Sequence, residues 1–196
     1  MQEHLSDYYV KQAKRDGYPS RAAYKLLELQ EKDQLITPGM RIVDLGAAPG
    51  GWSLVATELL NGKGQIVALD CLPMTPPARV HFIQGDFTEA QVLAELMAHL
   101  DNHPIDLVLS DMAPNISGLK SVDQPKSMYL AELAADFSQQ VLRPGGKFLI
   151  KLFQGGGVDG FIAGLRKQYS QVKVRKPKAS RSRSPEIYVL AQGFRP

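Results

Sequence analysis

The chain has 196 residues, of which 44% are apolar and 22% charged, and its formal net charge is +3. This length predicts one domain with a sizeable core, and the many apolar residues exclude disorder throughout. No apolar run approaches the roughly 20 residues that span a bilayer, which excludes a membrane protein. Residues 1–17 lack an apolar signal core, and the single cysteine, Cys71, excludes an internal disulfide, so we expect a cytoplasmic protein.

The positive charge is concentrated at the two ends of the chain. Residues 166–196 carry nine basic side chains and one acidic side chain, Glu186. A further basic group lies near the N-terminus: Lys11, Lys14, Arg15, Arg21 and Lys25. Because phosphate contacts come mainly from lysine and arginine, this pattern favours a polyanionic partner such as RNA. A solvated basic surface that serves solubility explains the charge alone equally well.

Short β-branched runs alternate with longer helix-like segments along most of the chain. A first helix is predicted from Ser20, a good N-cap, to about Asp33. Five strands are predicted over residues 41–44, 65–70, 80–83, 105–109 and 147–151. Helices are predicted between and after them, over about 52–60, 88–100, 127–142 and 159–169. Since several strands are apolar at consecutive positions, the alternation predicts a doubly wound, mainly parallel α/β fold.

The C-terminal part differs, because a loop too short for a crossover helix joins two further strands, 172–174 and 187–191. Strands joined in this way are antiparallel neighbours. A mainly parallel seven-stranded sheet with an antiparallel C-terminal strand and helices on both faces is typical of the Rossmann-like class I S-adenosylmethionine-dependent methyltransferase fold. We expect a single domain over residues 1–196, with an RNA-facing helical segment (1–38) packed on it and a basic C-terminal part (166–196) of strands and loop.

A glycine-rich loop, residues 44–52 (DLGAAPGGW), follows the first strand. Its glycines, Gly46, Gly50 and Gly51, allow a sharp turn and close approach to a ligand at the start of the next helix. A dinucleotide fingerprint would read G-x-G-x-x-G, whereas this loop reads G-x-x-P-G-G. The predicted cofactor is therefore S-adenosylmethionine rather than NAD or FAD, and the alternative is a tight turn without a ligand.

Acidic residues end successive strands. Asp70 closes the second strand, where a carboxylate can accept both hydroxyl groups of a ribose. Asp86 follows the third strand and can accept from an adenine amino group, with Phe87 beside the ring. Asp111 closes the fourth strand. Each aspartate alone could cap a helix or a turn, but three in order at the carboxyl edge of one sheet predict a nucleoside site.

Lys151 ends an apolar strand, where its charge requires an ion pair or solvent. Asp111 ends the neighbouring parallel strand at the same edge, and Glu186 begins the last strand there if that strand is antiparallel. We therefore expect Lys151 to meet both carboxylates, and Lys25 to add a second cation if its helix covers the cleft. The cofactor sulfonium and Lys25 favour a neutral Lys151 amine, whereas the acids favour its charged form, so the sequence leaves its protonation state open.

These residues lie in motifs that resemble the FtsJ-like (RrmJ-type) ribose 2′-O-methyltransferases, of the bacterial type that acts on large-subunit (23S) ribosomal RNA. The similarity covers essentially the whole chain, through residues 20–25 (SRAAYK), 43–53 (VDLGAAPGGWS), 84–87 (QGDF), 110–118 (SDMAPNISG), 151–155 (KLFQG) and 180–188 (SRSRSPEIY). Members of this family often carry a few more N-terminal residues, so we expect part of the N-terminal RNA grip to be absent here.

The resemblance implies that Lys151 accepts the proton within a catalytic tetrad of Lys25, Asp111, Lys151 and Glu186. It implies that S-adenosylmethionine contacts Gly50, Trp52, Asp70, Asp86 and Asp111. It also implies that the methyl group goes to the ribose 2′-hydroxyl of a uridine in 23S ribosomal RNA, and we expect the assembled 50S subunit to be the substrate. RNA would then lie across the first helix and the basic C-terminal part, with phosphate contacts from Arg181 and Arg183.

Other functions stay open on the sequence alone. The same tetrad would serve methylation of another RNA, such as a transfer RNA or a messenger RNA cap. A non-catalytic RNA-binding assembly factor could keep the fold, although both lysines and the cofactor loop are present. Tyr8, Tyr9 and Tyr24 are candidates for stacking on the uridine base, although packing is the commoner role of a helical tyrosine. We expect a monomer, no metal site, and a packing role for Cys71.

Overall fold

A computed structural model of the protein describes residues 2–115, 117–180 and 184–196, with side chains from residue 8 onward in those ranges. Arg181 and Arg183 lie outside the described residues. The elements run in the order α1 (Gln2–Asp16), α2 (Ala22–Asp33), β1 (Arg41–Leu45), α3 (Gly51–Leu60), β2 (Gln65–Asp70), β3 (Val80–Gln84), α4 (Ala90–Leu100), β4 (Ile105–Ser110), α5 (Lys120–Val141), β5 (Leu142–Phe153), α6 (Val158–Gln168), β6 (Tyr169–Arg175) and β7 (Glu186–Phe194).

The strands form one seven-stranded sheet in the order β3-β2-β1-β4-β5-β7-β6. The four pairs from β3 to β5 are parallel, whereas β7 runs antiparallel to both β5 and β6. The short β6–β7 connection excludes a crossover helix and forces this reversal. As a result, β7 begins at the edge of the sheet where the parallel strands end. The predicted fold class, including the antiparallel C-terminal strand, is confirmed.

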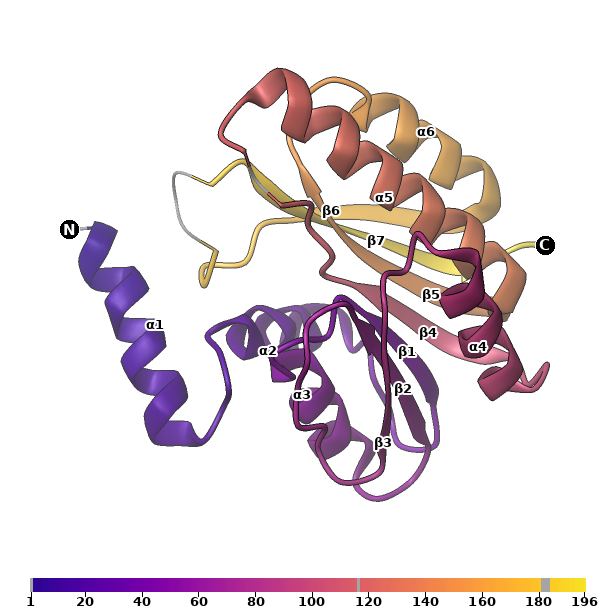
Figure 1. The fold of residues 1–196 in the computed structure, drawn as a ribbon, viewed down its shortest axis with the longest axis horizontal. Coiled ribbons are helices and arrows are strands. Elements are labelled where there is room, and N and C mark those ends of the chain that lie inside the picture. The colour runs from indigo at the N-terminus through magenta and orange to yellow at the C-terminus, as the bar shows by residue number, and fades with distance from the viewer. Residues whose placement is uncertain (1, 116, 181–183) are drawn as a thin grey trace.

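Helices cover both faces of the sheet: α2 and α3 lie on one face, and α4, α5 and α6 lie on the other (Figure 1). Each face has its own core. Successive strand residues alternate between the two, so that Ile42 packs with α2 and α3 while Val43 packs with α4 and α5. This double burial explains why the central strands are apolar at consecutive positions. Helix α1 lies outside these layers, at the left of Figure 1, and contacts α2 through the Tyr9 and Tyr24 rings.

Two helix starts differ from the predictions. Helix α2 begins at Ala22 instead of Ser20, although the Ser20 Oγ still accepts a hydrogen bond from the Ala22 backbone N–H at 3.3 Å. Helix α5 begins at Lys120, seven residues before the predicted start, and contains Pro125. The Asp123 carboxylate accepts hydrogen bonds from the backbone N–H groups of residues 117 and 118, which fixes the turn before α5 and lets the helix start ahead of the proline.

Strand ends also differ, because β5 runs over Leu142–Phe153 and β6 over Tyr169–Arg175, both longer than predicted.

Among the described helices, none is long and apolar enough to cross a membrane.

One carboxyl group lies inside the fold. Asp44, on β1, is completely buried, and its Oδ2 accepts a hydrogen bond from the Ser53 hydroxyl at 2.7 Å. Its Oδ1 has no hydrogen-bond partner within the described part of the chain. Burial, together with the negative charges of Asp111 and Asp70, raises the pKa of Asp44 to about 7, although the Ser53 hydrogen bond opposes this shift.

This raised pKa makes stability depend on pH. Between about pH 4 and pH 7 the unfolded chain ionises this carboxyl while the folded chain keeps the proton, so the contribution of Asp44 to stability is lost as the pH rises through the folded pKa. Replacement by Asn removes this penalty. We expect the free energy of unfolding of Asp44→Asn, relative to wild type, to increase by about 2 kcal/mol between about pH 5 and pH 8 in urea titrations. A difference that stays constant with pH would contradict the raised pKa.

Candidate active site

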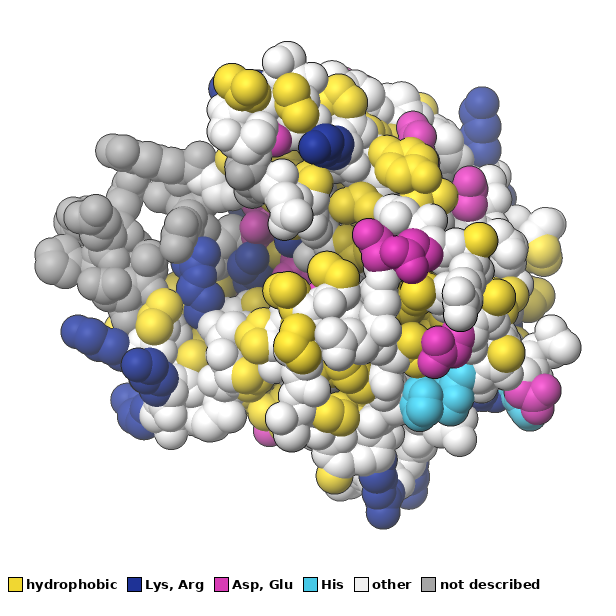
Figure 2. Space-filling model, viewed as in Figure 1, with side chains coloured by type: hydrophobic (Ala, Val, Ile, Leu, Met, Phe, Trp, Pro, Cys, Tyr) yellow, Lys and Arg dark blue, Asp and Glu magenta, His cyan; other side chains and the backbone are white. Residues whose placement is uncertain are grey.

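A cavity of about 470 Å³ opens at the carboxyl edge of the sheet, beside the ends of β1, β2, β4 and β5. The predicted site residues that line it are Gly46, Asp70, Asp86, Phe87, Asp111 and Lys151. Figure 2 shows acidic and basic side chains together at the floor of a hollow on this molecule. Cys71 also lines the cavity, so its thiol is exposed there rather than packed in the core.

The two aspartates that follow β2 and β3 are held by backbone hydrogen bonds. Asp70 accepts from the N–H of Ala48 at 2.9 Å and from the N–H of Leu72 at 2.8 Å, one with each carboxylate oxygen. Asp86 uses only Oδ1, which accepts from the N–H and the hydroxyl of Thr88. These hydrogen bonds lower the pKa of Asp86 below its ordinary value, so it is ionised at neutral pH. Both carboxylates are fixed acceptors for the hydroxyl or amino groups of a nucleoside.

The glycines of the loop after β1 face two different parts of the structure: the cavity and the segment before α2. Gly46 lines the cavity with φ +77°, and a Cβ there would lie 2.7 Å from the Met112 backbone nitrogen, so a larger residue cannot be accommodated. Gly51 instead packs against the segment before α2, where a Cβ would lie 2.9 Å from the Ser20 Oγ, and Gly50 precedes α3 with φ +103°. The missing side chain at Gly51 allows α2 to approach the start of α3.

Trp52 also faces α2. It is buried, its indole N–H donates a hydrogen bond to the Ala22 carbonyl at 2.9 Å, and its ring lies 5.7 Å from the Tyr188 ring. It is not among the side chains that line the 470 Å³ cavity. In this structure Trp52 therefore holds the helix that carries Lys25.

The four residues of the predicted tetrad are brought together by the sheet and α2. Lys151 forms an ion pair with Asp111, with Nζ 3.1 Å from Oδ1, and donates to the Asp111 backbone carbonyl at 2.6 Å. Lys25 lies on α2 and is buried, and its ammonium lies 2.6 Å from Glu186 Oε1. Lys25 and Glu186 are 161 residues apart in the sequence.

The pairing differs in one respect from the prediction, because Glu186 pairs with Lys25 and not with Lys151. The reason is the register of β5 and β7. Tyr188 is directly opposite Lys151, and Glu186 is opposite Phe153. The carboxylate is thus displaced along the edge and meets α2 instead.

Tyr188 joins the four tetrad residues, although it is not among the predicted site residues. It is fully buried, and its hydroxyl lies at the centre of the tetrad. It accepts from Lys25 at 3.1 Å, and it lies 2.9 Å from Glu186 Oε1 and 3.1 Å from Asp111 Oδ1. A phenol has one proton, so it donates to one of the two carboxylates at a time. Its position two residues after Glu186, in the motif of residues 180–188, is the feature of the sequence that points to it.

The electrostatics of the network keep the carboxylate charged and the phenol neutral. Burial raises the pKa of Glu186, but the charge of Lys25 and the hydrogen bonds from Lys25 and Tyr188 outweigh it, so this pKa is below its ordinary value. Burial and the negative charges of Asp111 and Glu186 raise the pKa of Tyr188 well above its ordinary value. Ser180 adds a hydroxyl hydrogen bond to Glu186 at 3.0 Å.

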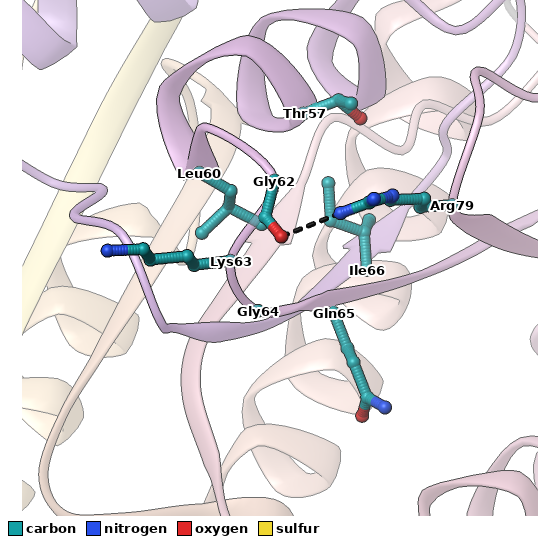
Figure 3. Close-up of a pocket in the computed structure, with 8 residues that line it drawn as sticks. All are labelled: Thr57, Leu60, Gly62, Lys63, Gly64, Gln65, Ile66 and Arg79. Carbon is teal, nitrogen blue, oxygen red and sulfur yellow. Dashed lines mark hydrogen bonds between the residues drawn. The ribbon is translucent and has the colours of Figure 1, made fainter.

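A second, much smaller cavity does not have room for an organic ligand. It has a volume of about 20 Å³ and lies at the opposite, amino end of β2, where Arg79 donates to the Gly62 carbonyl (Figure 3). This is room for about one water molecule. Among the described residues, no group of three His, Cys, Asp or Glu side chains is placed to hold a metal ion.

The basic residues of the C-terminal part do not form one surface. Lys173 and Arg175 form ion pairs with the buried Asp33 at the end of α2, at 3.3 and 2.8 Å. Lys176 and Lys178 are exposed in the loop between β6 and β7, at the same edge as the tetrad. Arg166 and Lys167 are exposed at the end of α6, where β6 begins, at the opposite edge of the sheet.

The tyrosines near the N-terminus pack on one another. Tyr9 lies between Tyr8 and Tyr24, with both pairs of ring centroids 5.5 Å apart. The Tyr24 hydroxyl donates to Asp16 at 2.7 Å, and the Tyr8 side chain is exposed. Tyr24 thus connects α1 to α2, and Tyr8 is the tyrosine of this group that is open to a ligand.

The cavity fits the predicted cofactor in size and in donor set, because it pairs an apolar wall at Phe87 with fixed carboxylates at Asp70 and Asp86. Together with the strand order and the antiparallel β7, this site defines a class I S-adenosylmethionine-dependent methyltransferase. The sequence profile of the FtsJ-like methyltransferase family matches residues 18–194. The chain belongs to this family.

Relatives of known name match this chain over nearly its full length. A ribosomal RNA large subunit methyltransferase E from Alkalilimnicola ehrlichii is 60% identical over 99% of this chain and 93% of its own. A protein of the same name from Pseudomonas aeruginosa is 55% identical over 100% of this chain and 94% of its own. A crystal structure from Plasmodium falciparum, assigned as a ribosomal RNA methyltransferase, superposes with a TM-score of 0.81 at 32% identity, covering 90% of this chain and 98% of that one.

The central position of Tyr188 predicts a cost in stability when its hydroxyl is removed. The Tyr188→Phe variant leaves both ion pairs in place but deprives the buried Lys25 and two partly buried carboxylates of a hydrogen-bond partner. We expect a loss of about 1–2 kcal/mol in the free energy of unfolding, measured by urea titration. The matched control is Tyr129→Phe on the exposed face of α5, which we expect to change stability by less than about 0.5 kcal/mol. Equal effects of the two variants would contradict the structural role of the hydroxyl.

Proposed function

We propose that this protein transfers the methyl group of S-adenosylmethionine to the ribose 2′-hydroxyl of a uridine in large-subunit (23S) ribosomal RNA, within the assembled 50S subunit. The observation that supports this most directly is the Lys151 amine, which faces the cofactor cavity while two oxygens of Asp111 hold it. The full-length relatives named as ribosomal RNA large subunit methyltransferase E support the RNA substrate.

The chemistry at Lys151 follows from its hydrogen bonds. When bound, S-adenosylmethionine supplies an electrophilic methyl group on a positively charged sulfur. Lys151 donates a hydrogen bond to the Asp111 backbone carbonyl and forms an ion pair with the Asp111 carboxylate, which together hold the amine in place. In its neutral form the amine carries a lone pair that can accept the proton of a 2′-hydroxyl. The lysine thus orients the hydroxyl and takes its proton as the oxygen is alkylated.

The other members of the tetrad position this amine. Asp111 holds Lys151 directly, and Tyr188 connects Asp111 to the pair formed by Lys25 and Glu186. Lys25 places a buried positive charge near the reacting groups, and Glu186 balances it. A fixed network of this kind keeps the base and the hydroxyl in attack geometry, which is the main contribution that a methyltransferase can make.

For the cofactor, we propose that Asp70 holds the ribose hydroxyls, that Asp86 accepts from the adenine amino group, and that Phe87 forms the apolar wall. Gly46 and Asp111 complete the cavity beside the methyl group. Gly50, Gly51 and Trp52 contribute by setting the start of α3 and the position of α2 against it.

We further propose that residues 1–196 act as one domain and one cytoplasmic monomer without a metal ion. The segment 1–38 supplies Lys25 and the exposed Tyr8, and the segment 166–196 supplies Glu186 and exposed lysines at the same edge. RNA would lie across these two parts. Because the reaction requires a 2′-hydroxyl, DNA is not a substrate.

The proposed function is tested with methyl-labelled S-adenosylmethionine and three substrates: isolated 50S subunits from cells lacking this activity, naked 23S RNA, and total transfer RNA. We expect label in 50S subunits, at one uridine that becomes resistant to alkaline cleavage, because 2′-O-methylation removes the attacking hydroxyl. Label in transfer RNA alone, or at a base, would contradict the proposal. Absence of methyl transfer with bound RNA would favour an assembly factor.

The role of Lys151 predicts a separable loss of activity. We expect Lys151→Ala to reduce the rate of methyl transfer by about 100-fold or more, since general-base catalysis contributes about that much. The dissociation constant for S-adenosylmethionine, measured by calorimetry, should change less than about threefold. Lys63→Ala, at an exposed lysine away from the carboxyl edge, is the control and should retain full activity. Near wild-type methylation by Lys151→Ala with normal cofactor binding would rule out Lys151 as the proton acceptor.

The RNA surface predicts a position-dependent effect of lysine removal. Lys178 is exposed in the loop beside the tetrad, and Lys167 is equally exposed at the opposite edge. We expect Lys178→Ala to weaken binding of 23S RNA and to reduce the slope of log K against log salt by about 0.7–0.9, the value for one phosphate contact. Lys167→Ala should leave both quantities unchanged in the same filter-binding titration. Identical slopes for the two variants would place the RNA elsewhere.

A further inference from the structure

A larger cavity, of about 730 Å³, lies next to the cofactor cavity and is not explained by cofactor binding. Its walls come from the start of α5, from the turn after β5 and from the residues just before β7. Its lining includes Pro114, Gln124, Phe153, Gly155, Gly156 and Pro185. The volume is in the range of sites that bind small molecules.

This cavity opens beside the reacting amine. Pro114 lines both cavities, so the two lie next to each other at that residue. The Phe153 ring belongs to the larger cavity, and its centre lies 5.8 Å from the Nζ atom of Lys151. A ligand group in the larger cavity would therefore lie beside whatever group Lys151 holds.

The chemistry of the walls suits a nucleobase. Phe153 presents an aromatic ring, and Pro114 and Pro185 add apolar surface, while the amide of Gln124 and backbone groups supply polar contacts. Bases that are drawn out of an RNA structure are held in this way, by stacking on an aromatic side chain with hydrogen bonds at their edges. In a nucleotide, the base is attached to C1′, next to the carbon that carries the 2′-hydroxyl. A 2′-hydroxyl held by Lys151 therefore places its base in an adjacent cavity.

The turn that carries Phe153 is held in place by Gln124. Its amide nitrogen donates to the Phe153 carbonyl at 3.2 Å and to the Gly156 carbonyl at 3.1 Å. This close approach requires a glycine at position 155, because a Cβ there would lie 2.6 Å from the Gln124 amide carbon. At Gly156 a Cβ would have no atom within 4 Å among the described residues. The chain thus fixes this wall by a specific contact.

We propose that the 730 Å³ cavity is the binding pocket for the base of the nucleotide that is methylated, with Phe153 as the stacking surface and Gln124 as a positioning residue for the turn. This inference rests on the proposed function and deepens it, because it assigns the part of the protein that reads the target uridine. The cofactor cavity and the tetrad need only the ribose, so base recognition is a separate property of this second cavity.

The test compares wild type and Phe153→Leu on two substrates, one with the target base and one without it. Once the methylated uridine is mapped, 50S subunits are reconstituted with RNA that carries at that position either uridine or a ribose without a base. We expect wild type to methylate the abasic substrate about tenfold more slowly, since loss of one stacked base has about this effect. Phe153→Leu should methylate the uridine substrate about tenfold more slowly than wild type, but the abasic substrate at the wild-type rate within about twofold. Phe153→Tyr keeps the ring and should retain the preference for the uridine substrate.

The abasic substrate also separates this role from a structural one. If Phe153 acted only by supporting Lys151, Phe153→Leu would slow both substrates by the same factor, and that result would overturn the proposal. If wild type methylated both substrates equally, the cavity would not hold the base, and the proposal would fail while the proposed function stood. If wild type methylated no ribosomal RNA, the proposed function itself would fail.

A matched pair of glycine variants tests the positioning role of Gln124. In Gly155→Ala the new methyl group displaces the amide from the turn, and we expect the preference for uridine over the abasic substrate to fall at least threefold. Gly156→Ala adds the same methyl group to open space and should keep the wild-type preference. Calorimetric binding of S-adenosylmethionine, expected to be unchanged in both variants, shows that each is folded. Equal preferences in the two variants would overturn the assignment of Gln124.

Discussion

A buried ion pair between Lys25 and Glu186 connects the two ends of this sequence and determines the shape of the site. Lys25 comes from a helix that covers one face of the sheet, and Glu186 begins the antiparallel strand β7. Because two charges removed from water need each other, neither side chain is stable there alone. Tyr188 then transmits this arrangement to Asp111, and Asp111 holds Lys151. The reversal of one strand is thus the structural reason that the Lys151 amine has a defined position.

The order of the strands also orders the ligands along one edge of the sheet. The proposed nucleoside part of the cofactor lies over the ends of β2 and β3, and the reacting groups lie over β4 and β5. The proposed base pocket follows at the turn after β5, and the exposed lysines follow in the loop between β6 and β7. Acidic groups therefore gather at the proposed cofactor site, and exposed basic groups lie at the proposed RNA surface. This separation is compatible with the small net charge of the whole chain.

The sheet and half of the tetrad could be predicted from sequence because both depend on local patterns. Apolar runs located the strands, and neighbouring parallel strands that end in Asp111 and Lys151 must meet at one edge. The partner of Glu186 could not be predicted, since it depends on the register of β5 and β7. Tyr188 was treated as part of an apolar strand, because its hydroxyl has no partner nearby in the sequence. The early start of α5 depends on the side chain of Asp123, which holds the turn before the helix by hydrogen bonds.

The distance along the chain between Lys25 and Glu186 has a consequence for folding. A contact between residues 161 positions apart closes a very long loop, and such contacts form late, after local structure is in place. The hydrogen-bond partners of Lys25, Glu186 and Tyr188, both lie on β7, so they are in place only once this strand has joined the sheet between β5 and β6. The network that holds Lys151 is therefore completed only when the C-terminal strand takes its place in the sheet.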